Sequence, residues 1–277
     1  MILEARAVDF SYDDGTRALD QASLVVKRQE ILAILGANGA GKSTLLSTLN
    51  GTFRPASGEV LLDGNLVSYS RKGLVELRSQ VGLVLQDPDD QLFAATVFED
   101  VSFGPLNLGL SVSQARTRVL EALAIMGIEA LSHRPTHLLS FGQRKRVAIA
   151  GVLAMSPAVL LLDEPTAGLD PKSVDELCET LRSLAVQGVA VVIATHDMDI
   201  AYNWADQIAV FARGKIIMEG RADDVFGKSG FERDTDLRLP LIYQLSNELR
   251  NSGLISQDGD LPRNVPDLVH QLRSHRS

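Results

Sequence analysis

The sequence is poor in several features that would point to particular classes of protein. It has one cysteine, Cys178, so no disulfide can form within the chain and a reducing compartment is expected. Its net charge of −8 argues against a broad basic surface for nucleic acid. The apolar stretches are far shorter than the roughly 20 residues that cross a bilayer, and no basic-then-apolar leader opens the chain. We therefore expect a soluble protein that binds no nucleic acid and reaches a membrane only through partners.

Apolar patterns along the chain predict an α/β fold. Residues 31–35, 159–162 and 189–194 form short continuous apolar runs, which are typical of strands covered on both faces. Further strands are expected at residues 2–9, 22–26, 58–62, 81–85, 208–211 and 215–219. Helices are expected after Ser140 and at residues 43–50, 113–126, 172–185, 239–250 and 265–273.

A glycine-rich stretch between a predicted strand and a predicted helix matches a phosphate-binding loop. Residues 36–44 read GANGAGKST, which fits the pattern G-x-x-x-x-G-K-[ST]. Glycines let the backbone N–H groups surround phosphates, and the following helix adds its positive end. We expect Lys42 to reach the β- and γ-phosphates and the Ser43 hydroxyl to ligate Mg²⁺. The other expected nucleotide-binding residues of this loop are Gly36, Asn38, Gly39, Ala40, Gly41 and Thr44.

Two adjacent carboxylates follow the apolar run at residues 159–162. At the end of a strand beside the phosphate loop, Asp163 would serve Mg²⁺. Glu164 would point the other way along the pleat and polarise an attacking water. A plain surface Asp-Glu pair is the alternative, and the phosphate loop elsewhere in the chain disfavours it. The sequence thus predicts a Mg·ATP site in which Asp163 and Glu164 have separate roles.

Several separated motifs together resemble the ATP-binding cassette family. They are the phosphate loop, Gln86, LSFGQ at 139–143, DEP at 163–165, AGLD at 167–170, and His196. The resemblance covers about residues 1–220 as a nucleotide-binding domain. It implies a P-loop NTPase core with a RecA-like mixed sheet, an antiparallel β-subdomain and a helical signature subdomain at about residues 87–156. Residues 221–277 would form a small, mostly helical C-terminal extension that stabilises a dimer or packs on its own subunit.

The resemblance implies that two identical chains close head to tail on two ATP molecules. Each ATP would be held by the phosphate loop of one chain and the signature loop of the other. The signature residues that would contact the γ-phosphate are Ser140, Gly142 and Gln143, and Asp170 would bridge the dimer. Ser140 is also a good helix N-cap, so its helix would aim its positive end at the partner's nucleotide.

Catalytic roles follow from the same resemblance. The expected catalytic residues are Glu164, His196, Lys42 and Gln86, and the expected Mg²⁺ ligands are Ser43, Gln86 and Asp163. His196 would hold the γ-phosphate and the attacking water, while Gln86 would also link the site to the helical lobe. Tyr12 lies where the family places an aromatic ring that stacks on adenine.

Two positions depart from the usual pattern of the family. Ala37 replaces a proline that is common in the phosphate loop, which removes no hydrogen-bond donor. Phe141 replaces the first of two glycines in the signature loop. Because Gly142 remains, we expect the backbone still to approach a phosphate closely.

Residues 86–105 indicate one subfamily of the ATP-binding cassette family. QDPDDQLF at 86–93, with the segment that follows it, is similar to the ATPases of energy-coupling-factor importers of prokaryotes. YSRKGL at 69–74 resembles the cobalt and nickel members of the CbiO type. Cobalt or nickel import is therefore the expected function, with a vitamin such as biotin as the alternative cargo.

The same resemblance implies membrane partners. The chain would sit at the cytoplasmic face of the prokaryotic inner membrane as a peripheral protein. It would bind integral membrane transport subunits, namely a transmembrane coupling protein and a substrate-binding membrane protein. The acidic residues at 87–105, together with Phe93 and Phe98, would receive a helix of such a partner.

Other ATP-binding cassette proteins act in export or in DNA or RNA metabolism. The latter carry long coiled-coil insertions or two cassettes in one chain, and this sequence shows no heptad run between residues 86 and 163. A transport subunit is therefore favoured over a non-transport ATPase.

Overall fold

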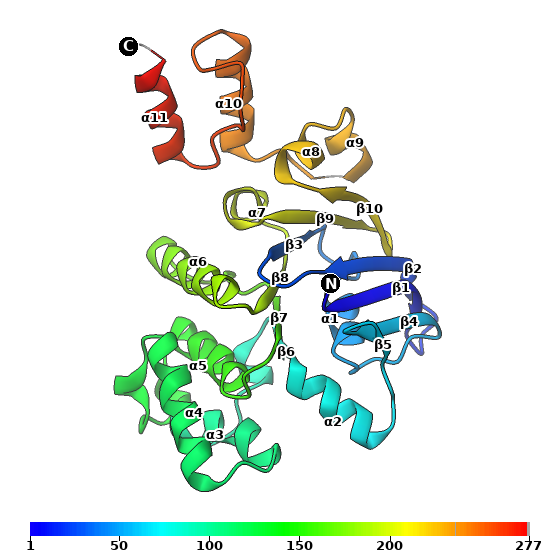
Figure 1. Ribbon diagram of the computed structural model, residues 1–277, viewed down its shortest axis with the longest axis vertical. Helices are drawn as coiled ribbons and strands as arrows, with labels where there is room; N and C mark the ends of the chain where they lie inside the picture. Colours follow the sequence, from blue (N-terminus) through cyan, green and yellow to red (C-terminus); the bar gives the residue numbers. More distant parts are fainter. Residues whose placement is uncertain (236, 276–277) are drawn as a thin grey trace.

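A six-stranded sheet runs through the centre of the molecule in the computed structural model, which describes residues 1–235 and 237–275 (Figure 1). Residues 236, 276 and 277, which fall in the predicted C-terminal extension, lie outside the described residues. The strands in spatial order are β10 (Lys215–Gly220), β9 (Gln207–Ala212), β3 (Ile31–Leu35), β8 (Ala190–Thr195), β7 (Val159–Asp163) and β6 (Val81–Val84). β10 pairs antiparallel with β9, and the other neighbours pair in parallel.

The register of the parallel strands brings distant parts of the sequence to one edge of the sheet. Leu35 at the end of β3 pairs with Thr195 at the end of β8, and Asp163 at the end of β7 pairs with Ala194. The residues that follow these positions therefore leave the sheet side by side. They are the phosphate loop, Glu164 and His196.

The continuous apolar runs are explained by cores on both faces of the sheet, as predicted. Along β7, Leu160 and Leu162 belong to the core that includes residues of helices α5 (Phe141–Leu153) and α6 (Pro171–Val186). Leu161 faces the opposite core, which is shared with helix α1 (Lys42–Leu49) and with a second sheet.

The second sheet is antiparallel and has four strands. Its order is β2 (Arg17–Val26), β1 (Leu3–Ser11), β4 (Ser57–Leu62) and β5 (Asn65–Leu66). Strand β1 bulges at Ala7, whose φ is 45°. Gly58 is needed opposite this bulge, because a Cβ there would lie 2.3 Å from the Ala7 carbonyl oxygen. Together the two sheets confirm the predicted mixed sheet with an antiparallel β-subdomain.

Helices α3 (Val97–Asn107), α4 (Val112–Ile125) and α5 form a helical lobe at one end of the molecule (Figure 1). Pairs of these helices pack around a core that includes Val101, Val119 and Val147. The short helices at Met198–Trp204, Ala222–Phe226 and Phe231–Thr235 were not predicted, and neither was α2 (Arg71–Gln80), which lies in a region expected to be strand-rich. Helix α2 is largely polar, and of its residues only Leu77 is buried. The signal that was present is Ser70, whose hydroxyl accepts a hydrogen bond from Gly73 N as an N-cap.

The other end of the molecule carries helices α7 (Met198–Trp204), α8 (Ala222–Phe226), α9 (Phe231–Thr235), α10 (Leu241–Asn251) and α11 (Val265–Ser274). A third core joins them to the sheet, and its largest side chains include Tyr202, Phe226, Phe231 and Tyr243. The two predicted tail helices are confirmed as α10 and α11, and α10 begins after Pro240. Among the described residues, no helix combines the length and apolarity that crossing a membrane requires.

Candidate nucleotide-binding and catalytic site

The phosphate loop leaves β3 at Gly36 and turns into α1 at Gly41. Both glycines are required by close packing, since a Cβ at Gly36 would lie 2.4 Å from the Phe211 carbonyl oxygen. A Cβ at Gly41, where φ is +108°, would lie 2.4 Å from the Ala18 carbonyl oxygen. The loop therefore keeps its path only with glycine at both positions.

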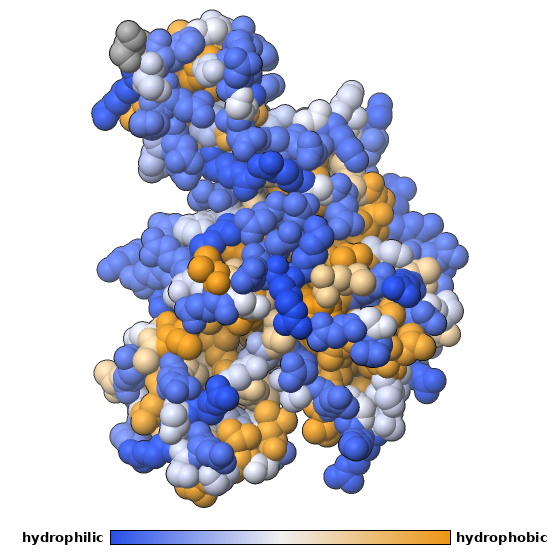
Figure 2. Space-filling model, in the orientation of Figure 1, coloured by the Kyte–Doolittle hydropathy of each residue, from blue (hydrophilic) through white to orange (hydrophobic). Residues whose placement is uncertain are grey.

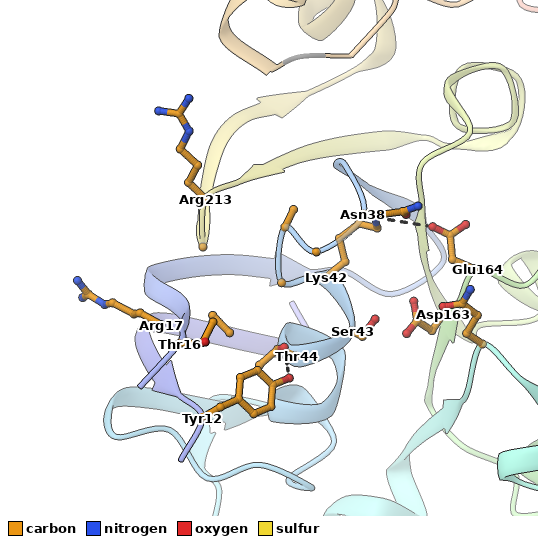
Figure 3. Close-up of a pocket in the computed structure, with 16 residues that line it drawn as sticks. Tyr12, Thr16, Arg17, Asn38, Lys42, Ser43, Thr44, Asp163, Glu164 and Arg213 are labelled. Carbon is orange, nitrogen blue, oxygen red and sulfur yellow. Dashed lines mark hydrogen bonds and ion pairs between the residues drawn. The ribbon is translucent and has the colours of Figure 1, made fainter. Parts of the chain in front are cut away.

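Lys42 is buried under this loop. Its Nζ donates hydrogen bonds to the carbonyl oxygens of Gly36 at 2.7 Å and Ala37 at 3.2 Å. The same Nζ lies 3.7 Å from Glu164 Oε1. Burial lowers the pKa of the Lys42 amine, and the charges of Glu164 and Asp163 oppose that shift. Glu164, which is distant in sequence, thus pairs with the lysine that the phosphate loop encloses, and Asp163 lies on the same side of the loop (Figure 3).

Asp163 provides a donor for a divalent cation. It is buried at the end of β7, and its Oδ1 has no hydrogen-bond partner among the described residues. Burial raises the pKa of the Asp163 carboxyl, and the nearby Ser43 hydroxyl lowers it by a smaller amount. An unpaired buried carboxylate oxygen beside a hydroxyl is an oxygen donor set that fits Mg²⁺. Gln86, which follows β6, lines the same pocket.

Glu164 is held from several sides. Its Oε1 lies 2.8 Å from Nδ1 of His196, and its Oε2 accepts a 3.0 Å hydrogen bond from the Thr195 hydroxyl. The side chain is buried, whereas that of His196 is 55% exposed. Glu164 lies just beyond β7 with a φ of 44°. A left-handed backbone turn, and not the strand pleat that we expected, therefore separates it from Asp163.

The phosphate loop and the carboxylates line one cavity of about 560 Å³. Tyr12 lies at its other side, where its hydroxyl is 2.7 Å from Thr44 Oγ1 (Figure 3). Its ring packs edge-on against Phe10 and Phe53 and is 41% exposed. An exposed, fixed aromatic ring beside a phosphate loop is suited to stacking on a base.

Several residues of this cavity were not predicted from the sequence. They are Thr16, Arg17, Ala18, Arg213 and Gly214. The first three come from the start of β2 and the loop before it, and the other two from the turn between β9 and β10. Figure 3 shows that the guanidinium groups of Arg17 and Arg213 point away from Glu164. No motif marks these positions, so only the folded chain brings them to the pocket.

The signature residues lie apart from this cavity within the chain. Ser140 is exposed at the N-terminus of α5 and forms a capping box with Gln143. The Ser140 N–H donates to the Gln143 side-chain oxygen, and the Gln143 N–H donates to the Ser140 hydroxyl. Of the predicted nucleotide-binding residues, those that do not line the cavity are Gly36, Ser140, Gly142, Gln143, Asp170 and His196. Asp170 caps α6 by accepting hydrogen bonds from Ser173, which lower the pKa of its carboxyl. One chain alone therefore does not bring the signature loop to its own phosphate loop.

The geometry fits a site for a nucleoside triphosphate, with a buried carboxylate oxygen beside it that is suited to a divalent cation. A model of the ABC transporter family matches residues 19–167, which is more than half of the 277-residue chain. The chain therefore belongs to the ABC transporter ATP-binding family, and it is an ABC-type ATPase as predicted.

Two relatives show which members of this family the chain resembles. The cobalt import ATP-binding protein CbiO of Rhodobacter capsulatus is 52% identical over 98% of this chain and 97% of that protein. The energy-coupling factor transporter ATP-binding protein EcfA2 of Clostridium perfringens is 47% identical over 94% of this chain and 92% of its own length. These names confirm the resemblance to energy-coupling-factor ATPases.

Solved structures agree with this placement. CbiO1 from Clostridium perfringens, part of the ABC transporter complex CbiONQ, gives a TM-score of 0.76 at 48% identity and covers 89% of this chain and 98% of that one. The dimeric cassette MJ0796, in a post-hydrolysis state bound to ADP and Pi, gives 0.73 at 29% identity and covers 80% and 99%. The predicted fold class is confirmed by these neighbours.

Proposed function

We propose that this chain is the ATP-hydrolysing subunit of an energy-coupling-factor importer for cobalt or nickel ions. The observation that best supports ATP hydrolysis at this site is the buried Glu164 carboxylate, which is held between His196, Thr195 and Lys42 at the phosphate loop. Similarity to a cobalt import ATP-binding protein supports cobalt as the transported ion. Proteins named only for energy-coupling factor transport are similar too, so a vitamin such as biotin is the second candidate.

The roles that we propose within the site follow from its contacts. The loop N–H groups and Lys42 bind the β- and γ-phosphates, and Tyr12 stacks on adenine. Ser43, Gln86 and Asp163 would hold Mg²⁺, which neutralises charge on the phosphate oxygens when it is bound with ATP. Glu164 orients water for in-line attack, and His196 keeps the carboxylate and the γ-phosphate in place.

A homodimer is part of the proposal. Ser140 and its capping box stand exposed at the positive end of α5, away from the phosphate loop of their own chain. A second copy of the chain, placed head to tail, would receive this helix end at its γ-phosphate. Asp170, exposed before α6, would contact the partner near the same place. A similar cassette that is dimeric with ADP and Pi supports this arrangement.

A groove between the helical lobe and the part of the chain formed by α2 and β6 is the proposed docking surface for the membrane subunits. It is lined by parts of α2, β6, α3 and α5, and by the loop after Gln86. Phe93 and Phe103 lie there with their ring centroids 4.7 Å apart, and they are 65% and 52% exposed. Figure 2 shows orange, apolar patches over this helical lobe. Exposed aromatic rings in a groove are suited to anchor a partner helix.

The structure corrects the expected charge of this surface. Asp100 is buried, and its Oδ2 accepts hydrogen bonds from the backbone N–H groups of Phe93 and Ala94, so it shapes the loop from inside. Glu99 belongs to the capping box of α3, and Asp89 pairs with Arg144 at 2.8 Å. Asp90 is the exposed acid that lines the groove itself. The groove is therefore more apolar than the sequence suggested.

The C-terminal extension, which we keep as a unit from about residue 221, packs on α7 of its own chain. Asp199 Oδ1 accepts a 2.8 Å hydrogen bond from Leu241 N, and Arg263 donates to the Ala205 carbonyl at 2.7 Å. The extension also leaves apolar side chains exposed on and between α10 and α11. They are Leu241, Leu245, Leu254, Val265 and Val269. We propose that this exposed face stabilises the homodimer.

Two measurements test the proposed transport function. Cells that carry the complete set of transporter genes should take up labelled cobalt or nickel, and the uptake should stop when Lys42 is replaced by alanine. The chain should sediment with membranes at the cytoplasmic face and wash off when its membrane partners are absent. Uptake of labelled biotin instead of either ion would select the second cargo.

A further inference from the structure

Lys145 is a buried lysine that has no role in the mechanism proposed above. It lies in α5 and is 1% exposed, although lysine is almost never buried without a partner. Its Nζ donates hydrogen bonds to the carbonyl oxygens of Glu164 at 2.6 Å and Ala167 at 3.1 Å. It therefore ties the helical lobe to the segment that follows β7.

That segment carries the carboxylate proposed to orient water. Glu164 has a φ of 44°, a left-handed conformation that costs free energy in a residue other than glycine. Its backbone N–H donates to the Ala194 carbonyl at 2.8 Å, and its own carbonyl accepts from Lys145. Both peptide groups of the strained residue are thus fixed, one by β8 and the other by the helical lobe.

Phe141 packs beside the ammonium group of Lys145. Its ring centroid lies 5.4 Å from Lys145 Nζ. The ring also packs against Gly168, since a Cβ there would lie 2.8 Å from it. The side chain that replaces a glycine in the signature loop therefore turns toward its own chain. It leaves the exposed Ser140 end of α5 open, and it shields the amine.

Lys145 does not line the phosphate-loop cavity. It lines a neighbouring cavity that Gln86 and Asp163 also border, and there its two hydrogen-bond acceptors are backbone carbonyls. A residue of this kind acts through the group it holds, so its loss should leave ATP binding in place and misdirect the Glu164 carboxylate. A shift of α5 would pass to Glu164 through the same ammonium group.

We propose that Lys145 is a positioning residue for ATP hydrolysis, which holds the Glu164 backbone so that its carboxylate faces the attacking water, and which couples the helical lobe to that carboxylate. The proposal rests on the proposed role of Glu164. It adds a residue outside the nucleotide pocket to the hydrolytic machinery.

The test is steady-state ATP hydrolysis by the full chain in its transporter complex. Lys145→Met keeps an unbranched side chain of similar size and removes the donors. We expect kcat to fall about tenfold or more while KM for ATP stays within about twofold. Lys145→Gln, which retains N–H donors on a shorter side chain, should lie between Lys145→Met and the wild type. Lys27→Met, at an exposed lysine that directly follows β2, is the matched control and should change neither constant.

Two results would overturn the proposal. One is a kcat for Lys145→Met within about twofold of the wild type, and the other is a KM that rises in step with the fall in kcat. If Lys145→Met does not fold, the same criteria apply to Lys145→Gln. Glu164→Gln is measured alongside: full activity of that variant removes Glu164 from its role, whereas an inactive Glu164→Gln with an unaffected Lys145→Met refutes only the role of Lys145.

Discussion

The imidazole of His196 and the carboxylate of Glu164 meet at 2.8 Å between Nδ1 and Oε1. The two residues are 32 positions apart in the sequence, and the parallel pairing of β7 with β8 brings them together. Because one carboxylate oxygen contacts His196 and the other accepts from Thr195, the direction of the carboxylate is fixed before any water is oriented.

Replacing Glu164 by glutamine should separate ATP binding from hydrolysis. The amide keeps the size of the side chain and loses the negative charge that we propose polarises water, so kcat should fall by about 10²–10⁴-fold. Binding of a fluorescent ATP analogue should persist, and size-exclusion chromatography with Mg·ATP should show a trapped dimer. Steady-state hydrolysis at the wild-type rate would remove Glu164 from this role.

Thr195→Val should destabilise the chain and reduce turnover. The substitution preserves shape at a fully buried position, and it leaves Glu164 Oε2 without its donor and the Asp197 backbone N–H without its acceptor, which should cost about 1–3 kcal/mol. Denaturant unfolding measures the loss. Thr48→Val is the matched control, because the equally buried Thr48 hydroxyl bonds only a helix carbonyl, that of Thr44. Equal stability losses in both variants would count against a special role for the Thr195 contact.

Binding to the membrane subunits should depend on the groove and not on the whole acidic segment. Asp90→Lys combined with Phe93→Ala should abolish copurification with the membrane subunits and leave nucleotide affinity unchanged. Asp89→Lys is less informative, because it also breaks the pair with Arg144 in α5. Glu121→Lys makes the same charge change as Asp90→Lys, at an exposed position of α4 in the same lobe. Undiminished copurification of the double variant would refute docking in this groove.

The exposed face of the extension can be tested without removing its core. Deleting residues 230–277 would strip Phe231 and Tyr243 from the core they share with Tyr202. Leu241→Asp with Leu245→Asp instead changes side chains that are 72% and 47% exposed. We expect this double variant to fold and to lose dimer stability in analytical ultracentrifugation. An unchanged dimer would show that the extension serves its own subunit.

Motifs with a fixed chemical pattern were predicted well from the sequence. The phosphate loop and the carboxylate pair follow short continuous apolar runs, which are typical of strands covered on both faces, so their meeting at one edge of a parallel sheet could be expected. Helix α2 was missed because it buries little apolar surface, and its N-cap was the remaining signal.

Features that depend on packing could not be predicted from the sequence. The inward turn of Phe141 depends on Gly168, a residue of another loop. The burial of Lys145 depends on two backbone carbonyls about 20 positions away. The sequence pattern of α5 shows Lys145 between two arginines and gives no sign that it alone of the three is fully buried.

The central claim is that each ATP is bound between two copies of this chain. Lys42→Ala disables the phosphate loop and Ser140→Glu disables the signature loop, so each homodimer should be inactive. A mixed dimer with one copy of each, isolated through two different tags, has one intact composite site and should recover roughly half of the wild-type rate if the sites are independent. Full activity of Ser140→Glu alone, or a mixed dimer that is as inactive as its parents, would contradict the account.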